Sequence, residues 1–173
     1  MTYQKLTIDD FDALYKILQE HFPEKEQKEY NYMKQAIIQG KINVIVQKEE
    51  GTIIGALCYV LLDAYAFIDY LVIVNQHQGK RLGEKILQHF ISLMDRPIVL
   101  EVELPDTPIA KRRIAFYQRQ NFILNEHHYE VPENGLRPTC TFLLMTYPRA
   151  ISQEEFDILY PQLMLHGYGI EGG

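Results

Sequence analysis

Two groups of residues in this chain have types and spacing suited to chemistry, and the first is a glycine-bearing turn. Glycines at positions 79 and 83 flank Lys80 and Arg81, after the apolar, β-branched run Phe67–Val74 and before an apolar helical repeat that extends to Met94. A strand that ends in such a turn and opens a helix presents unpaired backbone N–H groups, which bind an anion. Because glycine is common in turns, an ordinary strand-to-helix connection is the alternative interpretation.

The second group consists of acidic residues on predicted strands. Glu101 and Glu103 lie two apart in an aliphatic run, so both project from one strand face. Two carboxylates are costly to bury, which indicates either a hydrated cleft or an exposed strand face. Asp69, on the preceding strand, is a reserve candidate, and in a cleft all three carboxylates would attract a cationic amine.

Hydrophobic periodicity predicts the elements that position these residues. Apolar residues at helical spacing predict helices near 9–22, 24–38, 82–94, 107–121 and from 152 onward. Runs rich in β-branched and aromatic residues predict strands at 3–7, 42–47, 52–63, 67–74, 97–104, 122–131 and 139–146. This order predicts an α/β (α+β) domain in which helices flank a mixed sheet.

Polar residues and glycines mark the predicted helix ends. Asp9 or Asp10 is expected to cap the first helix, and Asp106 or Thr107 the fourth. Ser152-Gln-Glu-Glu155 is a capping-box sequence that starts the last helix, and Gly40 is the expected stop of the second.

Composition restricts the class of protein. With 173 residues and 47% hydrophobic content, the chain is predicted to be a single domain over 1–173, with a core of about 1–147 and a tail of 148–173. A net charge of −6 argues against nucleic-acid binding. No run is long enough for a membrane span, and the N-terminus lacks the apolar core of a signal peptide. A cytoplasmic protein with two free thiols, Cys58 and Cys140, is therefore expected.

Two motifs carry a resemblance to a known family. The stretch Leu71-Val-Ile-Val-Asn-Gln-His-Gln78-Gly-Lys-Arg-Leu-Gly83 resembles the acetyl-CoA signature of the GNAT superfamily of N-acetyltransferases, a strand followed by Gln/Arg-x-x-Gly-x-Gly/Ala opening a helix. Further on, Phe116-Tyr117-Gln-Arg-Gln-Asn-Phe122 resembles the second motif of the family, Phe-Tyr-x-x-x-Gly-Phe. The resemblance implies a GNAT-like, mostly antiparallel sheet flanked by helices, with a short helical C-terminal tail.

The resemblance also implies roles for individual residues. Backbone groups of Gln78, Gly79, Lys80, Arg81, Leu82 and Gly83 would receive the pyrophosphate of acetyl-CoA, and the backbone of Leu71, Val72 and Ile73 would pair with its pantetheine arm. Tyr117 would protonate the departing CoA thiolate, although core packing is the alternative for a tyrosine on an amphipathic helix. Glu101 is the first candidate for the base and Glu103 the second, and a bound water could relay the proton.

Two positions depart from the family pattern. Arg81 and Asn121 stand where the family usually has glycine. Asparagine tolerates the left-handed backbone conformation, so Asn121 is a plausible helix terminator. If Arg81 has helical dihedral angles, the site needs only its N–H group.

The predicted function is acetyl transfer from acetyl-CoA, by a direct mechanism, to a primary amine of a small-molecule or peptide acceptor. The alternatives are a non-catalytic acyl-CoA-binding or regulatory module on the same fold and a nucleotide-binding protein that uses the same turn. The acidic residues favour a cationic small molecule such as a polyamine or amino sugar. No metal is expected, because adjacent His127 and His128 point to opposite strand faces. The apolar stretch 160–166 would pack on the domain or on a second copy in a homodimer.

Overall fold

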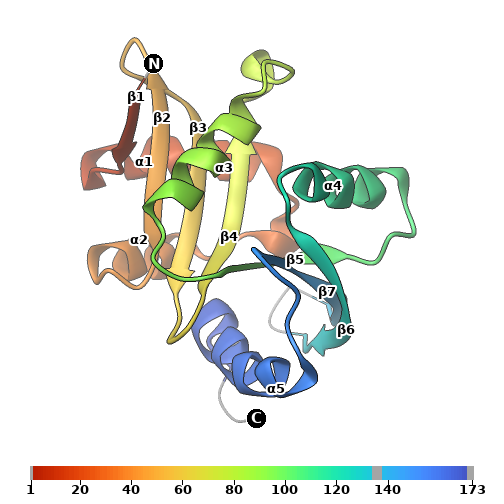
Figure 1. Ribbon diagram of the computed structural model, residues 1–173. Helices are drawn as coiled ribbons and strands as arrows, with labels where there is room; N and C mark the ends of the chain where they lie inside the picture. Colours follow the sequence, from red (N-terminus) through yellow and green to blue (C-terminus); the bar gives the residue numbers. More distant parts are fainter. Residues whose placement is uncertain (1, 134–137, 171–173) are drawn as a thin grey trace. The chain divides into compact units, whose positions relative to one another are not determined.

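The fold is a mixed sheet with helices on its faces (Figure 1). The computed structural model describes residues 2–133 and 138–170. Its strands are β1 (Thr2–Lys5), β2 (Asn43–Glu49), β3 (Thr52–Leu61), β4 (Ala66–Ile73), β5 (Ile98–Glu103), β6 (Ile123–Val131) and β7 (Cys140–Tyr147). The helices are α1 (Phe11–His21), α2 (Tyr30–Ile38), α3 (Leu82–Leu93), α4 (Pro108–Arg119) and α5 (Gln153–Gln162).

The strand order in the sheet is β1-β2-β3-β4-β5-β7-β6. Strands β4 and β5 run parallel, whereas β1–β2, β2–β3, β5–β7 and β6–β7 are antiparallel pairs. The prediction of a mixed, mostly antiparallel sheet flanked by helices, with a helix in the tail, is confirmed.

The chain divides into two compact units, and β4 contributes to both. The first unit comprises Met1–Leu61 and Asp69–Leu93, and the second comprises Leu62–Ile68 and Met94–Gly173. The prediction of one domain over residues 1–173 stays a prediction.

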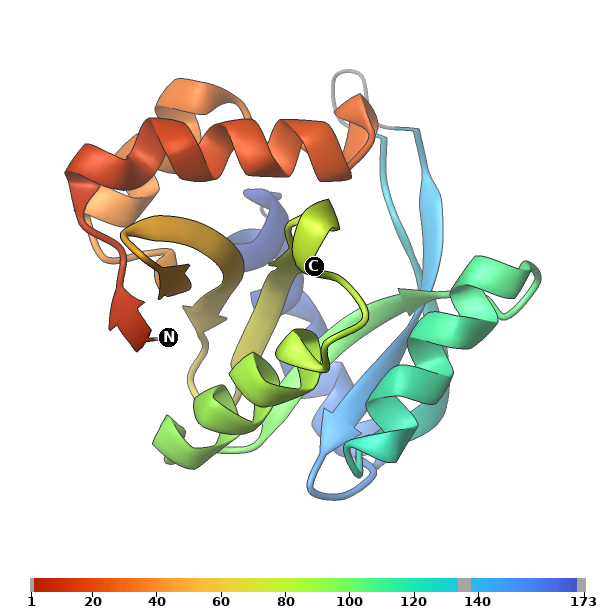
Figure 2. The same cartoon turned by 90° about the horizontal axis from the view of Figure 1, so that it is seen from above.

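In the first unit, α1 and α2 cover one face of β2, β3 and β4, and α3 covers the other (Figure 2). The apolar repeat of α3 explains its position, because Ile86, Leu87 and Phe90 are fully buried. Helix α1 buries Phe11 and Leu14 in the same way. Each such side chain stabilises the fold by about 1.5–3 kcal/mol relative to exposure to water.

The start of two predicted helices needs correction. The helix expected from residue 24 begins at Tyr30, where the Glu29 carboxylate accepts hydrogen bonds from Asn31 N (3.1 Å) and Tyr32 N (2.8 Å). Residues Glu24–Glu26 form only a single 3-10 turn. Asp10 precedes α1 without capping it, because its carboxylate accepts a hydrogen bond from Lys48 Nζ at 2.7 Å.

In the second unit, α4 and α5 lie on opposite sides of β5, β7 and β6 (Figure 1). Thr107 caps α4 through its hydroxyl, which accepts from Ala110 N at 3.1 Å, and Pro108 occupies the first turn. Asn121 follows the helix with a φ of 69°, so the predicted left-handed terminator is confirmed.

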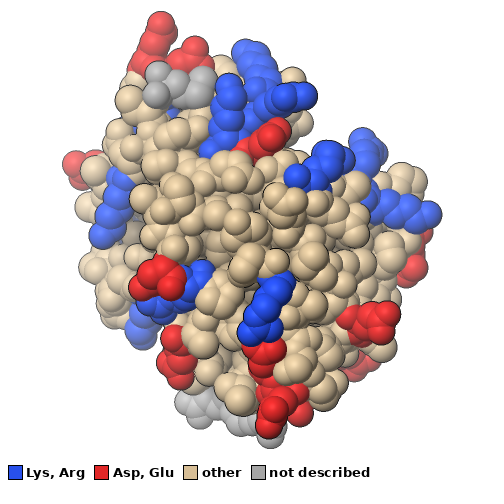
Figure 3. Space-filling model, in the orientation of Figure 1, with Lys and Arg blue, Asp and Glu red and all other residues tan. Residues whose placement is uncertain are grey.

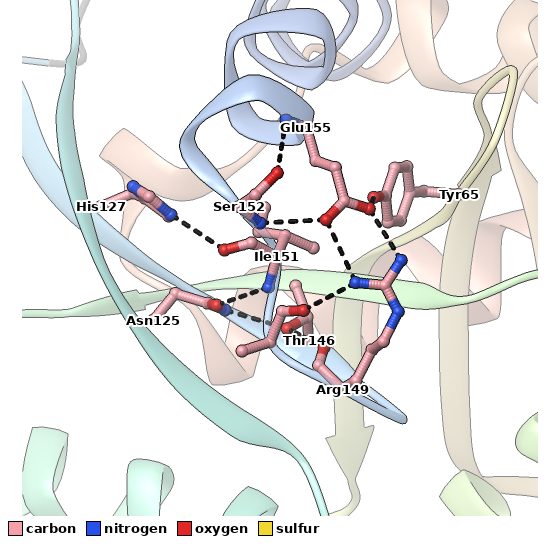
Figure 4. Close-up of polar contacts among 9 residues, drawn as sticks. Tyr65, Asn125, His127, Thr146, Arg149, Ile151, Ser152 and Glu155 are labelled. Carbon is pink, nitrogen blue, oxygen red and sulfur yellow. Dashed lines mark hydrogen bonds and ion pairs between the residues drawn. The ribbon is translucent and has the colours of Figure 1, made fainter.

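The tail is attached to this unit through polar contacts at the start of α5 (Figure 4). Ser152 and Glu155 form the predicted capping box, and Arg149 donates to both Glu155 oxygens, at 3.1 and 2.8 Å. Asn125 on β6 accepts from Ile151 N at 3.0 Å and donates to Thr146 Oγ1 at 2.9 Å. The tail therefore begins at a fixed point on β6 and β7.

No helix among the described residues is long and apolar enough to cross a membrane. Both cysteines are free thiols; Cys58 is buried as expected, whereas Cys140 is half-buried.

Candidate active site

The turn between β4 and α3 lies entirely in the first unit. After β4 the chain makes a 3-10 turn at Asn75–His77 and reaches α3 at Leu82. The exposed side chain of Gln78 links the turn to the end of β4, because its Nε2 donates to Ile73 O at 3.0 Å and to Asn75 Oδ1 at 3.1 Å. The glutamine of the predicted signature thus fixes the path of the chain from strand to helix.

Two residues of this turn have a left-handed backbone. The φ of Gly79 is 86° and that of Arg81 is 59°. The Arg81 carbonyl accepts from Lys85 N at 3.1 Å, so Arg81 immediately precedes the helix. The helical dihedral angles considered for Arg81 are therefore not observed, and the residue adopts the conformation that glycine adopts most easily.

The turn presents backbone donors in succession. Among the described residues, the N–H groups of the consecutive positions from Gly79 to Glu84 have no hydrogen-bond partner. The last three belong to the first turn of α3, where the helix dipole adds partial positive charge. The arrangement is suited to a phosphate-sized anion.

Charged side chains surround these donors. Lys80, Arg81 and Lys85 are exposed, and Figure 3 shows Lys and Arg side chains gathered over this end of α3. Glu84 lies in the first helical turn, and its negative charge partly offsets their positive charge. Gly83 is half-buried in the same turn, whereas the Leu82 side chain is buried in the core.

Strand β4 offers extended backbone next to the turn. Its parallel register with β5 runs only from Ala66↔Ile98 to Ile68↔Leu100 and includes none of the residues from Asp69 to Ile73. Val72 is buried, and Leu71 and Ile73 are half-buried. An added extended chain can pair with such a strand edge.

The two glutamates of β5, in the second unit, have different surroundings. Glu101 is half-buried and Glu103 is exposed. Tyr129 donates a hydrogen bond to Glu101 Oε2, and Tyr168 donates one to Oε1. The two carboxylates share a strand face, as predicted, but only Glu101 is enclosed by other side chains.

Tyr129 is a buried residue of β6. Burial, followed by the charge and hydrogen bond of Glu101, raises the pKa of Tyr129 well above its ordinary value. The hydroxyl therefore stays protonated and donates at neutral pH.

Tyr117, also in the second unit, lies near the end of α4. Its ring makes edge contacts with Phe116 and Phe122, at centroid distances of 5.1 and 5.6 Å. Burial raises the pKa of Tyr117 to about 12, against an opposing effect of the Arg113 guanidinium. Within the part of the chain that the structure describes, its hydroxyl has no hydrogen-bond partner. The half-buried ring packs against these two aromatic residues, and the hydroxyl takes no part in that packing.

The reserve candidate Asp69 is ion-paired. Its Oδ2 lies 3.0 Å from Lys28 Nζ, with only 12% and 15% of the two side chains exposed. Lys28 also lies over the Tyr70 ring, 5.6 Å from the centroid. Burial, and then the charge of Asp69, raises the pKa of Cys58.

Sequence reasoning did not find Tyr129 and Tyr168. Tyr129 is one aromatic residue in a strand, and its partner Glu101 lies 28 positions away. For Tyr168 a local signal exists in the run Gly167-Tyr168-Gly169. Two flanking glycines indicate that the backbone there adopts a conformation, or approaches another group at a distance, that only glycine readily allows. The described residues contain no group of three or more His, Cys, Asp or Glu that could hold a metal ion.

Comparison with known proteins identifies the class. Residues 11–122 match the Acetyltransferase (GNAT) family, which is most of the chain. The chain therefore belongs to the GNAT acetyltransferase family, and the predicted resemblance is confirmed.

Individual relatives agree with this assignment. The chain is 33% identical over 110 residues to "Putative acetyltransferase YjbC" of Bacillus subtilis (strain 168); the match covers 62% of the chain and 55%, about half, of that relative. A solved structure titled "Putative acetyltransferase from GNAT family from Bacteroides thetaiotaomicron" has a TM-score of 0.89 at 26% identity and covers 99% of this chain and 100% of its own. Arabidopsis thaliana NAA60 in complex with acetyl-CoA has a TM-score of 0.67 at 14% identity, covering 84% of this chain and 97% of its own, which shows a shared fold.

Proposed function

We propose that this acetyltransferase moves the acetyl group of acetyl-CoA directly to a primary amine. The observation that carries the proposal is the run of unpartnered N–H groups from Gly79 to Glu84 at the start of α3. The backbone groups from Gln78 to Gly83 bind the CoA pyrophosphate, and Lys80 and Arg81 supply positive charge.

The pantetheine arm pairs with the backbone of Leu71, Val72 and Ile73, which the β4–β5 register leaves out. A backbone N–H of this strand then polarises the acetyl carbonyl, as in an oxyanion hole. Because only backbone groups act here, the apolar side chains of the strand are compatible with the role.

The transfer itself needs a base and an acid. The amine nitrogen loses its proton to the base and attacks the carbonyl carbon. The C–S bond breaks, the electron pair leaves on sulfur, and the thiolate takes a proton from the Tyr117 hydroxyl. The resulting tyrosinate regains a proton from solvent.

The high pKa of Tyr117 defines how it acts as the acid. With a pKa of about 12, the hydroxyl is fully protonated at neutral pH. A thiol pKa near 8.5 makes complete proton transfer from such a tyrosine uphill by a factor of more than about a thousand. The Tyr117 hydroxyl therefore donates a hydrogen bond to the sulfur as the C–S bond breaks, and the uphill proton transfer is completed when solvent reprotonates the tyrosinate.

Glu101 is the leading candidate for the base, followed by Glu103. The ion pair with Lys28 makes Asp69 a weaker candidate, because its Oδ2 already contacts Lys28 Nζ at 3.0 Å. Glu101→Gln should lower turnover, with partial recovery at high pH, where more of the amine arrives deprotonated. Glu103→Gln and Asp69→Asn, measured beside it, assign the base by whichever variant shows that recovery.

The acceptor is proposed to be a cationic small molecule, with a peptide amine as the second class. The decisive experiment measures thiol release from acetyl-CoA by the purified chain with a panel of polyamines, amino sugars and peptides. Acetyl-CoA binding without transfer to any amine would favour a regulatory acyl-CoA-binding module. Displacement of CoA by ATP at similar concentrations would instead favour a nucleotide-binding protein.

A further inference from the structure

Helix α4 carries a positive charge one turn before Tyr117, on the same side of the helix. Arg113 and Tyr117 are four residues apart, and at 3.6 residues per turn their side chains leave the axis within about 40° of each other. Long side chains in a helix lean toward its N-terminus, which brings a residue over the one four positions before it. The guanidinium and the phenol are therefore neighbours on one face of α4.

Arg113 belongs to a run of three basic residues, but the three point in different directions. Lys111, Arg112 and Arg113 are all exposed. By the same helical geometry, Arg112 points about 140° away from Tyr117 and Lys111 about 120° away. The run as a whole is a solvated surface, and Arg113 is its member on the side of the tyrosine.

The charge of Arg113 is not taken up by a carboxylate. Within the ranges that the structure describes, Arg113 makes no hydrogen bond and no ion pair. Other arginines do, since Arg96 pairs with Asp95 and Arg149 with Glu155. Burial raises the pKa of Tyr117, and the Arg113 guanidinium acts on it in the opposite direction, so its field reaches the hydroxyl.

We propose that Arg113 is a positioning residue that acts through Tyr117, stabilising the negative charge that the tyrosine oxygen carries while the CoA thiolate departs. This inference rests on the proposed function, which makes Tyr117 the acid, and adds the residue that supports it.

The chemistry follows from where the charge goes. When the C–S bond breaks, its electron pair stays on sulfur and the phenolic proton moves to it. The negative charge then lies on the Tyr117 oxygen until water returns a proton. The rings of Phe116 and Phe122, which pack against Tyr117, carry no charge that could stabilise it. An arginine one turn away stays positive at every working pH, so it lowers the energy of the tyrosinate without giving up a proton.

The variants are Arg113→Met, which removes the charge and keeps a long apolar stem, and Arg112→Met as the matched control. The control makes the same change at the adjacent exposed position, which points away from Tyr117. Neither side chain is buried, so both variants should fold, and thermal unfolding checks this. Arg113→Lys restores the charge without the guanidinium.

The first measurement needs neither acetyl-CoA nor an acceptor. The full chain is labelled with 3-fluorotyrosine, and the fluorine NMR signal of Tyr117 is identified by its absence in Tyr117→Phe. The electron-withdrawing fluorine brings the ionisation to lower pH, nearer the range in which the chain is folded. In Arg113→Met this signal should titrate at higher pH than in the unaltered chain. In Arg112→Met its titration should be unchanged.

The second measurement is turnover, with the amine that accepts acetyl groups in the panel of polyamines, amino sugars and peptides. At saturating acetyl-CoA, Arg113→Met should lower kcat by about three- to tenfold, the effect of one exposed charge at about 5–6 Å. The KM values for acetyl-CoA and for the amine should not change. Arg113→Lys should recover most of the loss, and Arg112→Met should show none.

A double-mutant cycle separates action through Tyr117 from action elsewhere. Once Tyr117→Phe has removed the hydroxyl, adding Arg113→Met should lower kcat no further. Added NaCl should reduce the kcat difference between Arg113→Met and the unaltered chain, because salt screens exposed charges.

The outcomes are distinct. An unchanged Tyr117 titration in Arg113→Met, equal losses of kcat in Arg113→Met and Arg112→Met, or additive losses in the cycle would each overturn the inference. A raised KM for acetyl-CoA with unchanged kcat would overturn it too, by making Arg113 a cosubstrate contact. A shifted titration without acetyl transfer to any amine would overturn the proposed function, and with it the part of Arg113 in the transfer. The stabilisation of the tyrosinate by Arg113 would still stand.

Discussion

The turn after β4 consists mainly of backbone groups, whereas the cluster around Glu101 consists of side chains. The turn offers backbone N–H groups, two left-handed residues and exposed positive side chains, all within the residues from 78 to 85. The cluster brings together side chains from β5, β6 and the end of the chain. A backbone site depends on local conformation, whereas a side-chain site depends on the packing of distant segments.

This difference implies that the two sites respond separately to mutation. Substitutions in the turn should change the handling of acetyl-CoA alone. Substitutions in the second unit should change turnover or acceptor binding and leave CoA affinity intact. Each of the following predictions tests that separation, beginning with the largest expected effect.

Tyr117→Phe should lower turnover by about 10²–10⁴-fold, the range typical of losing a general acid. The ring that packs between Phe116 and Phe122 is retained, so the fold and the affinity for CoA should survive. Steady-state kinetics with an acceptor, where chemistry limits the rate, gives the comparison. Near-normal turnover would remove Tyr117 from the mechanism, and lost CoA affinity would show that the two sites are not separate.

Gly83→Val should weaken CoA binding by roughly 10–100-fold, the cost of disturbing one or two charge-assisted hydrogen bonds to phosphate. The new side chain would crowd the N–H groups in the first turn of α3. Calorimetry with CoA measures the loss, and thermal unfolding confirms that the variant is folded. Gln88→Val, on the exposed side of the same helix, is the control. Unchanged CoA affinity in folded Gly83→Val would disprove the assigned cosubstrate site.

The fold and the turn could be predicted from sequence because both depend on local patterns. The order of helices and strands follows from apolar spacing, and the turn follows from its glycines. The start of α2 could not be placed, because Glu24 just after Pro23 offered an earlier start, and only the folded chain shows that the Glu29 carboxylate caps the helix.

The Glu101 cluster was beyond sequence reasoning for a physical reason. Glu101 and Glu103 are both glutamates and lie on the same strand face. They differ because Tyr129 and Tyr168, 28 and 67 positions away in the sequence, donate hydrogen bonds to Glu101. Likewise, nothing near Asp69 in sequence indicates that Lys28 pairs with it. Long-range pairing of this kind is decided by packing, and the local signal at Gly167-Tyr168-Gly169 does not identify the partner of the tyrosine.

Arg81→Gly tests what the Arg81 side chain contributes to the turn. Glycine has no Cβ penalty at a φ of 59°, so the free energy of unfolding should rise by about 1 kcal/mol. Loss of the guanidinium should lower CoA affinity a few-fold and reduce its dependence on salt. Asn121→Gly, at a φ of 69° in the second unit, is the matched control and should leave CoA affinity unchanged. A salt dependence identical to that of the unaltered chain would exclude a phosphate contact by Arg81.

The smallest effect concerns the contact that fixes the tail on which Tyr168 depends. The hydrogen bond from Arg149, followed by the backbone N–H of Ser152, lowers the pKa of Glu155 to about 2 from an ordinary 4.5. Because the folded pKa is the lower one, this contribution to stability is present above about pH 4.5 and is lost as the pH falls toward 2. Glu155→Gln should therefore flatten the dependence of unfolding free energy on pH in that window. Glu154→Gln makes the same charge change in the same helical turn and should retain the slope. Equal slopes in the two variants would show that the Arg149–Glu155 pair does not hold the tail, and the side-chain site would then need another anchor.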